Sequence, residues 1–177
     1  MSAVLASTQT IGRFELIREL GRGAQGTVHL ARDPHLDRLV AIKALRLSGD
    51  TKDRAQRMSL LMQEARLVSK LHHPNIVTLF DAVEHQGAPC LVFEYVEGRP
   101  LSDVVVASER LPATQIVDIA IGILRGISFA HGKKVLHRDI KPANVMLTAA
   151  GTPRVMDFGI ACEASAAPLS EKVLYGT

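Results

Sequence analysis

Hydrophobic and polar residues alternate along residues 14–45 in a way that predicts three β-strands. The first strand runs into a cluster of glycines, and Thr27–Ala31 and Leu39–Leu45 follow on either side of Asp33-Pro34. Alternation with a period of two is typical of strands that bury one face, and glycine and proline mark the turns between them. The start of the chain is therefore expected to fold as an antiparallel sheet.

The period of the pattern becomes helical over residues 51–71. Leu60, Val68 and Leu71 are expected to lie on one stripe of this helix, and His73-Pro74 ends it. A helix with one apolar stripe buries that stripe against another element. We expect it to pack on the sheet.

The rest of the chain returns to strands and then turns mainly helical. The predicted elements are strands at 76–83 and 90–95, a long amphipathic helix at 112–130, and short strands at 145–147 and 154–156. Strands come first and helix dominates after Gly98. This order predicts an α+β fold of two lobes that meet near Glu94–Gly98, the first with five strands and one helix.

Composition narrows the functional classes. The chain has 177 residues, is 47% hydrophobic and carries a formal net charge of +3, with 4% aromatic residues and no tryptophan. Neither a basic stretch nor an aromatic stacking surface is present in the sequence, so nucleic-acid binding is not expected. Cys90 and Cys162 lie in no paired or metal-ligand spacing, and two free thiols suit a reducing cytoplasm.

Targeting signals are not expected either. Residues 1–9 lack the basic start and apolar core of a signal peptide. The most apolar stretch, Ile116–Ile127, contains Asp118 and Arg125, so no membrane span is predicted within this chain.

A glycine-rich segment suggests a phosphate site. Residues 21–28 read Gly-Arg-Gly-Ala-Gln-Gly-Thr-Val and fit G-x-G-x-x-G-x-V. Glycines let the backbone pass close to phosphates, to which its N–H groups can donate. The same glycine spacing opens a helix in dinucleotide-binding folds. Here strand residues follow, which favours a strand–loop–strand flap over that turn.

Two charged residues are expected to meet across the lobe. In the run Val40-Ala41-Ile42-Lys43, the strand period places Ala41 and Lys43 on one face. Glu64 falls within the predicted apolar stripe of the helix, where a carboxylate is costly unless it is paired. A cation on the facing strand would pair with it, and Lys43 is available, whereas the alternative is a Glu64 that is solvated on a looser helix. Together with the motifs described next, an ion pair between Lys43 and Glu64 is favoured.

Two further motifs carry a family resemblance. Residues 137–144 read His-Arg-Asp-Ile-Lys-Pro-Ala-Asn and resemble the catalytic loop of protein kinases, while Asp157-Phe158-Gly159 resembles their magnesium-binding motif. Residues 40–43 are similar to the V-A-I-K of the third kinase strand. Because these elements occur in the family's order, the sequence from residue 14 to residue 177 resembles the protein kinase superfamily.

The resemblance implies a role for each motif residue. Asp139 would accept the proton of the substrate hydroxyl, Lys141 would neutralise the transferred phosphate, and Asn144 and Asp157 would hold Mg²⁺. Lys43 and Glu64 complete the catalytic set. The residues expected to bind ATP are Leu20, Gly21, Gly23, Gly26, Val28, Ala41, Lys43, Glu94, Val96 and Met146.

Residues 137–146, His-Arg-Asp-Ile-Lys-Pro-Ala-Asn-Val-Met, and residues 157–161, Asp-Phe-Gly-Ile-Ala, resemble bacterial eukaryotic-like serine/threonine kinases. Lys141 also resembles the serine/threonine class. The resemblance implies a kinase-like bilobal fold, with an extension at 1–13, an N-lobe at 14–95 and part of a helical C-lobe at 96–177. The similarity stops before the A-P-E motif of the family. We therefore expect a kinase domain truncated within the activation segment.

The expected function is transfer of the ATP γ-phosphate to Ser or Thr of protein substrates. The alternatives are a truncated, non-catalytic module that binds ATP or a partner, and a small-molecule kinase. Family resemblance also implies dimerisation through the N-lobe. The expected location is cytoplasmic, and the alternative is the cytoplasmic part of a longer membrane-anchored kinase. Residues 161–175 are expected to form a loop regulated by phosphorylation at Ser165 or Ser170.

Overall fold

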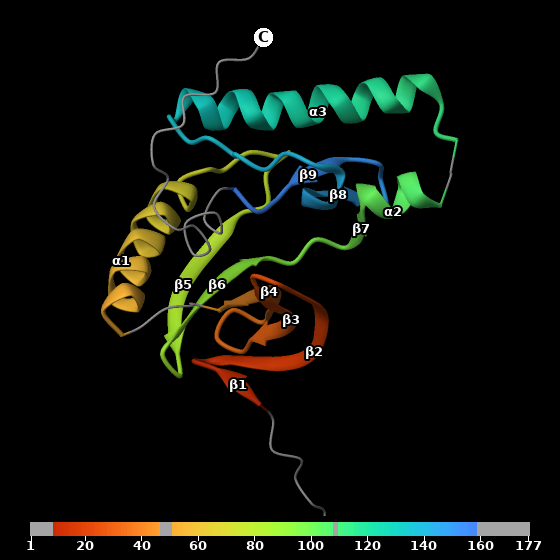
Figure 1. Cartoon of the computed structure of the whole chain (residues 1–177). Helices are drawn as coiled ribbons and strands as arrows, with labels where there is room; N and C mark the ends of the chain where they lie inside the picture. The colour runs from red at the N-terminus through yellow and green to blue at the C-terminus, as the bar shows by residue number, and fades with distance from the viewer. Residues whose placement is uncertain (1–8, 47–50, 108–109, 159–177) are drawn as a thin grey trace, which may run out of the picture.

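The computed structural model describes residues 9–46, 51–107 and 110–158, and its larger layer is an antiparallel sheet (Figure 1). The expected activation loop lies outside the described residues. The sheet has six strands in the order β1-β2-β3-β4-β6-β5. Their bounds are β1 Thr10–Ile11, β2 Phe14–Gly23, β3 Gly26–Asp33, β4 Arg38–Leu45, β5 Leu79–His85 and β6 Ala88–Glu94.

Five of these strands match the prediction, and β1 is an addition. Ile11 pairs with Phe14, is only 5% exposed, and packs into the same apolar cluster as Ala31 and Val40. The sheet therefore begins at Thr10, within the segment predicted as an N-terminal extension. A strand of two residues is too short to show alternation in the sequence.

Helix α1, Thr51–Val68, packs against the sheet beside β5 (Figure 1). The predicted stripe needs a correction, because Leu60 is 40% exposed whereas Leu61, Ala65 and Val68 are buried. The buried residues are spaced by four and then three positions, which keeps them on one helix face more closely than the predicted stripe of Leu60, Val68 and Leu71. Glu64 then lies at the border of the buried face.

The second lobe combines a small sheet with helices. It contains β7 Gly98–Pro100, α2 Leu101–Val106, α3 Ala113–Gly132, the 3-10 turn η1 Pro142–Asn144, β8 Val145–Thr148 and β9 Pro153–Val155. The three strands pair in the order β7-β8-β9. Figure 1 shows α3 on the side of this small sheet that faces away from the large one. Strand β7 and helix α2 were not predicted.

The segment before β5 joins the two lobes. Residues 76–78 were predicted as strand, but Ile76 instead forms a parallel bridge with Val155 of β9. The Val77 N–H donates to the Val155 carbonyl at 2.8 Å, and the Asn75 side chain donates to the Pro153 carbonyl at 2.9 Å. The start of β5 is therefore anchored on the C-lobe.

Two glycines allow α3 to approach this junction closely. Gly122 and Gly126 are buried, and a Cβ built on Gly122 would lie 2.5 Å from Cγ of Pro153 and 3.0 Å from Nδ2 of Asn75. Glycine spacing on one helix face thus sets the distance between α3 and β9.

We expect Gly122→Ala to destabilise the protein by about 1–3 kcal/mol, because the added methyl group overpacks this contact. Gly132→Ala is the matched control, since a Cβ there meets nothing within 4 Å. The control should be neutral or stabilising, because alanine is favoured over glycine in helices. Urea unfolding of both variants measures the difference, and equal midpoints would show that the α3–β9 contact is loose.

By length and apolar composition alone, α3 would be able to cross a membrane, although no span was predicted. Its buried residues are Ile119, Gly122, Gly126 and Ala130, which form the face that packs on the protein. The opposite face is apolar and open, with Val117 55% and Leu124 65% exposed. Core helices of proteins that never enter a membrane share this composition, so the pattern does not identify a span.

Candidate active site

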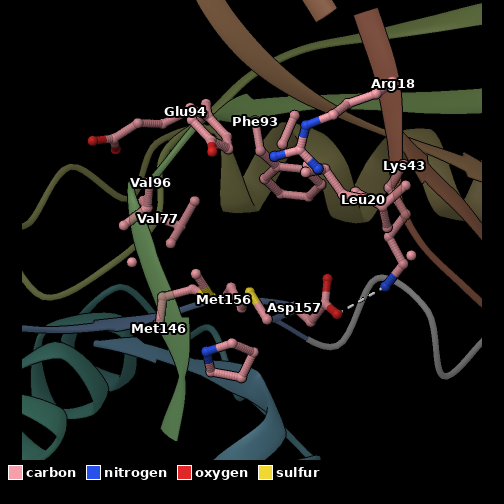
Figure 2. A pocket seen from close by; sticks show the side chains of 16 residues that line it. Arg18, Leu20, Lys43, Val77, Phe93, Glu94, Val96, Met146, Met156 and Asp157 are labelled. Carbon is pink, nitrogen blue, oxygen red and sulfur yellow. Dashed lines mark ion pairs between the residues drawn. The ribbon is translucent and has the colours of Figure 1, made fainter. Parts of the chain in front are cut away.

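A cavity of about 370 Å³ lies between the large sheet and the C-lobe, as Figure 2 shows. Strands β2, β3, β4 and β6 supply its upper wall, and Met146 and Met156 close it from below. Eight of the residues predicted to bind ATP line it: Leu20, Gly21, Val28, Ala41, Lys43, Glu94, Val96 and Met146. The cavity is mainly apolar, which suits a flat heteroaromatic ring.

Several lining residues were not among those predicted to bind ATP. They are Arg18, Val77, Phe93, Tyr95, Gly98, Pro100, Met156 and Asp157, the last of which was predicted as a metal ligand. Met156 directly precedes Asp157 on the chain, so its place in the cavity could have been inferred from this adjacency. Val77 carries no such signal, because it reaches the cavity only through the bridge between Ile76 and Val155.

A second cavity of about 720 Å³ continues from the first, since both are lined by Gly21, Val28, Lys43, Pro100 and Asp157. Its roof is the glycine-rich loop, residues 21–26, including the remaining predicted residues Gly23 and Gly26. Its floor is made by Asp139, Lys141, Ala143 and Asn144. The result is one cleft with an apolar end and a polar end.

Asp139 is held by its neighbours in the catalytic loop. Lys141 Nζ lies 2.7 Å from Asp139 Oδ2, and Nδ2 of Asn144 donates to the same oxygen at 3.0 Å and to the Asp139 carbonyl at 2.8 Å. The hydrogen bond from Lys141 and then that from Asn144 lower the pKa of Asp139 below its usual value. The carboxylate is therefore ionised at neutral pH and able to accept a proton or hydrogen bond.

His137 supports this loop from inside the protein. His137 is 2% exposed, its ring packs against Phe158 at a centroid distance of 4.7 Å with the ring planes tilted by 53°, and its Nδ1 accepts the Asp139 N–H. Nε2 lies 2.8 Å from the Met156 carbonyl, to which it donates in the neutral tautomer. Burial lowers the pKa of His137, so the ring is neutral. It joins the catalytic loop to the segment that carries Asp157.

Comparison with known proteins decides the family. The family model described as "Protein kinase domain" matches residues 14–177. The chain belongs to the protein kinase domain family.

Its relatives include bacterial serine/threonine kinases. PksC of Streptomyces coelicolor is 43% identical over 155 residues, which cover 83% of this chain and 28% of PksC. PrkC of Bacillus subtilis is 36% identical over 167 residues, which cover 94% of this chain and 26% of PrkC. The chain thus spans about a quarter of the length of these relatives.

A solved structure supports the same assignment. The kinase domain of PknI from Mycobacterium tuberculosis matches with a TM-score of 0.77 and 29% identity. The match covers 89% of this chain and 62% of that domain. The predicted partial kinase-like fold is confirmed.

In this kinase domain the predicted pairing of Lys43 with Glu64 is wrong. Lys43 Nζ lies 2.9 Å from Oδ2 of Asp157 (Figure 2). It also donates to Oε1 of Gln25 at 3.2 Å. Glu64 instead pairs with Arg138 at 3.4 Å. The physical reason is the rotation of α1, which buries Leu61 and Ala65 and places Glu64 beside the catalytic loop.

Magnesium fits the polar end of the cleft. Asp157 offers a carboxylate, and the side chain of Asn144 uses its amino group on Asp139, so its oxygen remains as a cation ligand. Mg²⁺ is commonly held by one or two protein oxygens together with substrate phosphates. Asp157 also has a φ of +60°, a left-handed conformation that costs energy in a residue other than glycine and is common at functional sites.

Proposed function

We propose that this protein binds Mg-ATP in the cleft and transfers the γ-phosphate to Ser or Thr hydroxyls of protein substrates. The observation that carries the proposal is the shared cavity in which Asp139 and Lys141 face Lys43, Asp157 and the glycine-rich loop. These residues supply a proton acceptor, two cations and a metal ligand, which phosphoryl transfer requires.

Each residue has a distinct task in this proposal. The ionised Asp139 orients the attacking hydroxyl and accepts its proton as the hydroxyl oxygen bonds to the γ-phosphorus, while the bond from that phosphorus to the bridging oxygen breaks and ADP leaves. Lys141, next to Asp139, is placed to neutralise charge on the group being transferred. The bound metal supplies charge neutralisation at the phosphates, and Asn144 and Asp157 would hold it.

The ion pair between Lys43 and Asp157 holds the two groups close together. Binding of Mg-ATP would exchange partners, since phosphate oxygens attract Lys43 and the cation attracts Asp157. Lys43 and Asp157 would each gain a new partner of opposite charge at least as strong as the one lost. The ion pair would therefore break without leaving an unpaired buried charge. We infer that Mg²⁺ and the triphosphate bind cooperatively.

Titration calorimetry with ADP tests the nucleotide site of the proposal. ADP should bind more tightly with Mg²⁺ than with EDTA, and equal affinity in both would contradict the assignment of Asn144 and Asp157. Binding without any phosphate transfer by the natural full-length protein would favour the alternative of a non-catalytic module. Transfer to a sugar or an aminoglycoside, and not to protein, would indicate a small-molecule kinase.

Two further expectations belong to this proposal. A cytoplasmic location fits an enzyme that depends on ATP and contains the thiol of Cys90, which is buried and unpaired with any cysteine among the described residues. Dimerisation through the N-lobe is supported by exposed apolar side chains on its strands and turns, with Ile17 51%, Leu36 60% and Leu39 43% exposed. Light scattering of the purified protein distinguishes monomer from dimer.

A further inference from the structure

An ion pair lies directly behind the part of the cleft where β6 ends. The Glu94 side chain points away from the cavity, as Figure 2 shows, although the residue lines it. Its Oε2 accepts from Nη2 of Arg154 on β9, and the same guanidinium nitrogen donates to the Ile76 carbonyl at 2.9 Å. Arg154 therefore connects three segments that are distant in sequence.

Glu94 is also hydrogen-bonded to Thr78, which directly precedes β5. The backbone N–H of Thr78 donates to Oε2 at 3.3 Å, and the N–H of Glu94 donates to the Thr78 carbonyl at 2.9 Å. The two side chains are mostly shielded, with 29% of Glu94 and 18% of Arg154 exposed. Shielded, charge-assisted hydrogen bonds of this kind fix geometry more strongly than surface ion pairs do.

Arg154 lies on the segment that leads to Asp157. It pairs with Met146 across β8 and β9, and Met146 and Met156 form the lower wall of the cavity. The next residue, Val155, is fixed to Asn75 and Val77 by backbone hydrogen bonds of 2.8 Å each. Arg154 thus belongs to the small sheet of the C-lobe, whereas Glu94 belongs to the large sheet.

We propose that Arg154 is a positioning residue for nucleotide binding, because its guanidinium fixes the backbone at Glu94 relative to β9 and the lower wall of the cleft. This inference rests on the proposed function, in which the cleft binds ATP. The backbone around Glu94 borders the apolar end of the cleft, and Met146 and Met156 face it from below. A fixed separation between these walls gives a flat ring a slot of constant width.

The choice of arginine matters for this role. Both hydrogen bonds come from one guanidinium nitrogen, Nη2, whose two N–H groups are held in a fixed planar arrangement. Lysine at this position would keep the charge but not the fixed orientation. Arg154→Lys is therefore expected to restore part of the function that Arg154→Met removes.

Adenosine is the appropriate probe, because it enters the apolar end without phosphates that would contact Lys43. We expect Arg154→Met and Glu94→Gln each to weaken adenosine binding about tenfold, equivalent to about 1.4 kcal/mol. The double variant should bind adenosine no more weakly than the single variant with the lower affinity, because the two residues act as one unit. ADP binding should weaken by the same factor as adenosine binding.

Arg32→Met is the matched control, since it removes the exposed ion pair with Asp37, far from the residues that line the cleft. All titrations are made well below the melting temperatures, which are recorded for every variant. A purely structural ion pair would lower the melting temperature and leave the adenosine Kd unchanged, and that result would overturn the inference. If Arg154→Met does not fold, Glu94→Gln and Arg154→Lys provide the same comparison.

The two proposals fail in different ways. Wild-type protein that binds neither adenosine nor ADP would refute the proposed function and this inference with it. Wild-type protein that binds both, with variants that bind equally well, would refute only the role of Arg154.

Discussion

Replacing Asp139 with asparagine is expected to lower phosphate transfer by about 10²- to 10⁴-fold while leaving nucleotide affinity nearly unchanged. Asparagine keeps the size of the side chain but cannot accept the hydroxyl proton. Asp139 lies at the floor of the polar cavity, outside the lining of the apolar one, so the adenine end is undisturbed. Initial rates with the natural full-length protein, together with the Kd for ADP, measure both effects.

The control for this variant is Asp118→Asn, an equally conservative change on the exposed side of α3. It should transfer phosphate at the wild-type rate. Comparable rates for Asp139→Asn and wild type would remove Asp139 from the proton-accepting role. A parallel loss of ADP affinity would show that the substitution acts by disturbing the loop, since Asp139 bonds Lys141 and Asn144.

Replacing Lys43 with methionine should reduce transfer by roughly 10²- to 10³-fold, the usual cost of removing one preorganised group that stabilises transition-state charge. Methionine fills a similar volume, and Lys43 is only 8% exposed, so packing is largely kept. Unlike Asp139→Asn, this variant should bind ADP more weakly and adenosine normally. The reason is that the ammonium lies beside Asp157 at the phosphate end of the cleft.

Lys70→Met serves as its control, because Lys70 is exposed just after α1 and lines neither cavity of the cleft. It should match the wild type in rate and in both affinities. If Lys43→Met retained full transfer, the partner exchange between Lys43 and Asp157 would have no place in the reaction. An equal loss of adenosine binding would instead point to collapse of the cleft.

The parts of the site that could be predicted are those carried by short, continuous motifs. Asp139, Lys141 and Asn144 lie within one loop, so their spacing in sequence already brings them together. Lys43 and Asp157 are distant in the chain, and the sequence could assign each to phosphate or metal only by resemblance. Their direct contact follows from the tertiary fold and from no pattern in the sequence.

The parts that could not be predicted depend on tertiary contacts. The partner of Glu64 is decided by which face of α1 is buried, and the sequence allowed both the Leu60 stripe and the observed Leu61 stripe. Arg154 and Glu94 are 60 positions apart and show no pattern that links them. Such pairs depend on how the lobes are joined, which short-range periodicity does not encode.

The most direct test of the whole account is transfer from γ-labelled ATP to a protein substrate by the natural full-length protein, followed by identification of the labelled amino acid. The account predicts label on serine or threonine, complete dependence on Mg²⁺, and loss of label with Asp139→Asn. Label on tyrosine or on a small molecule, or transfer that persists in EDTA, would contradict it.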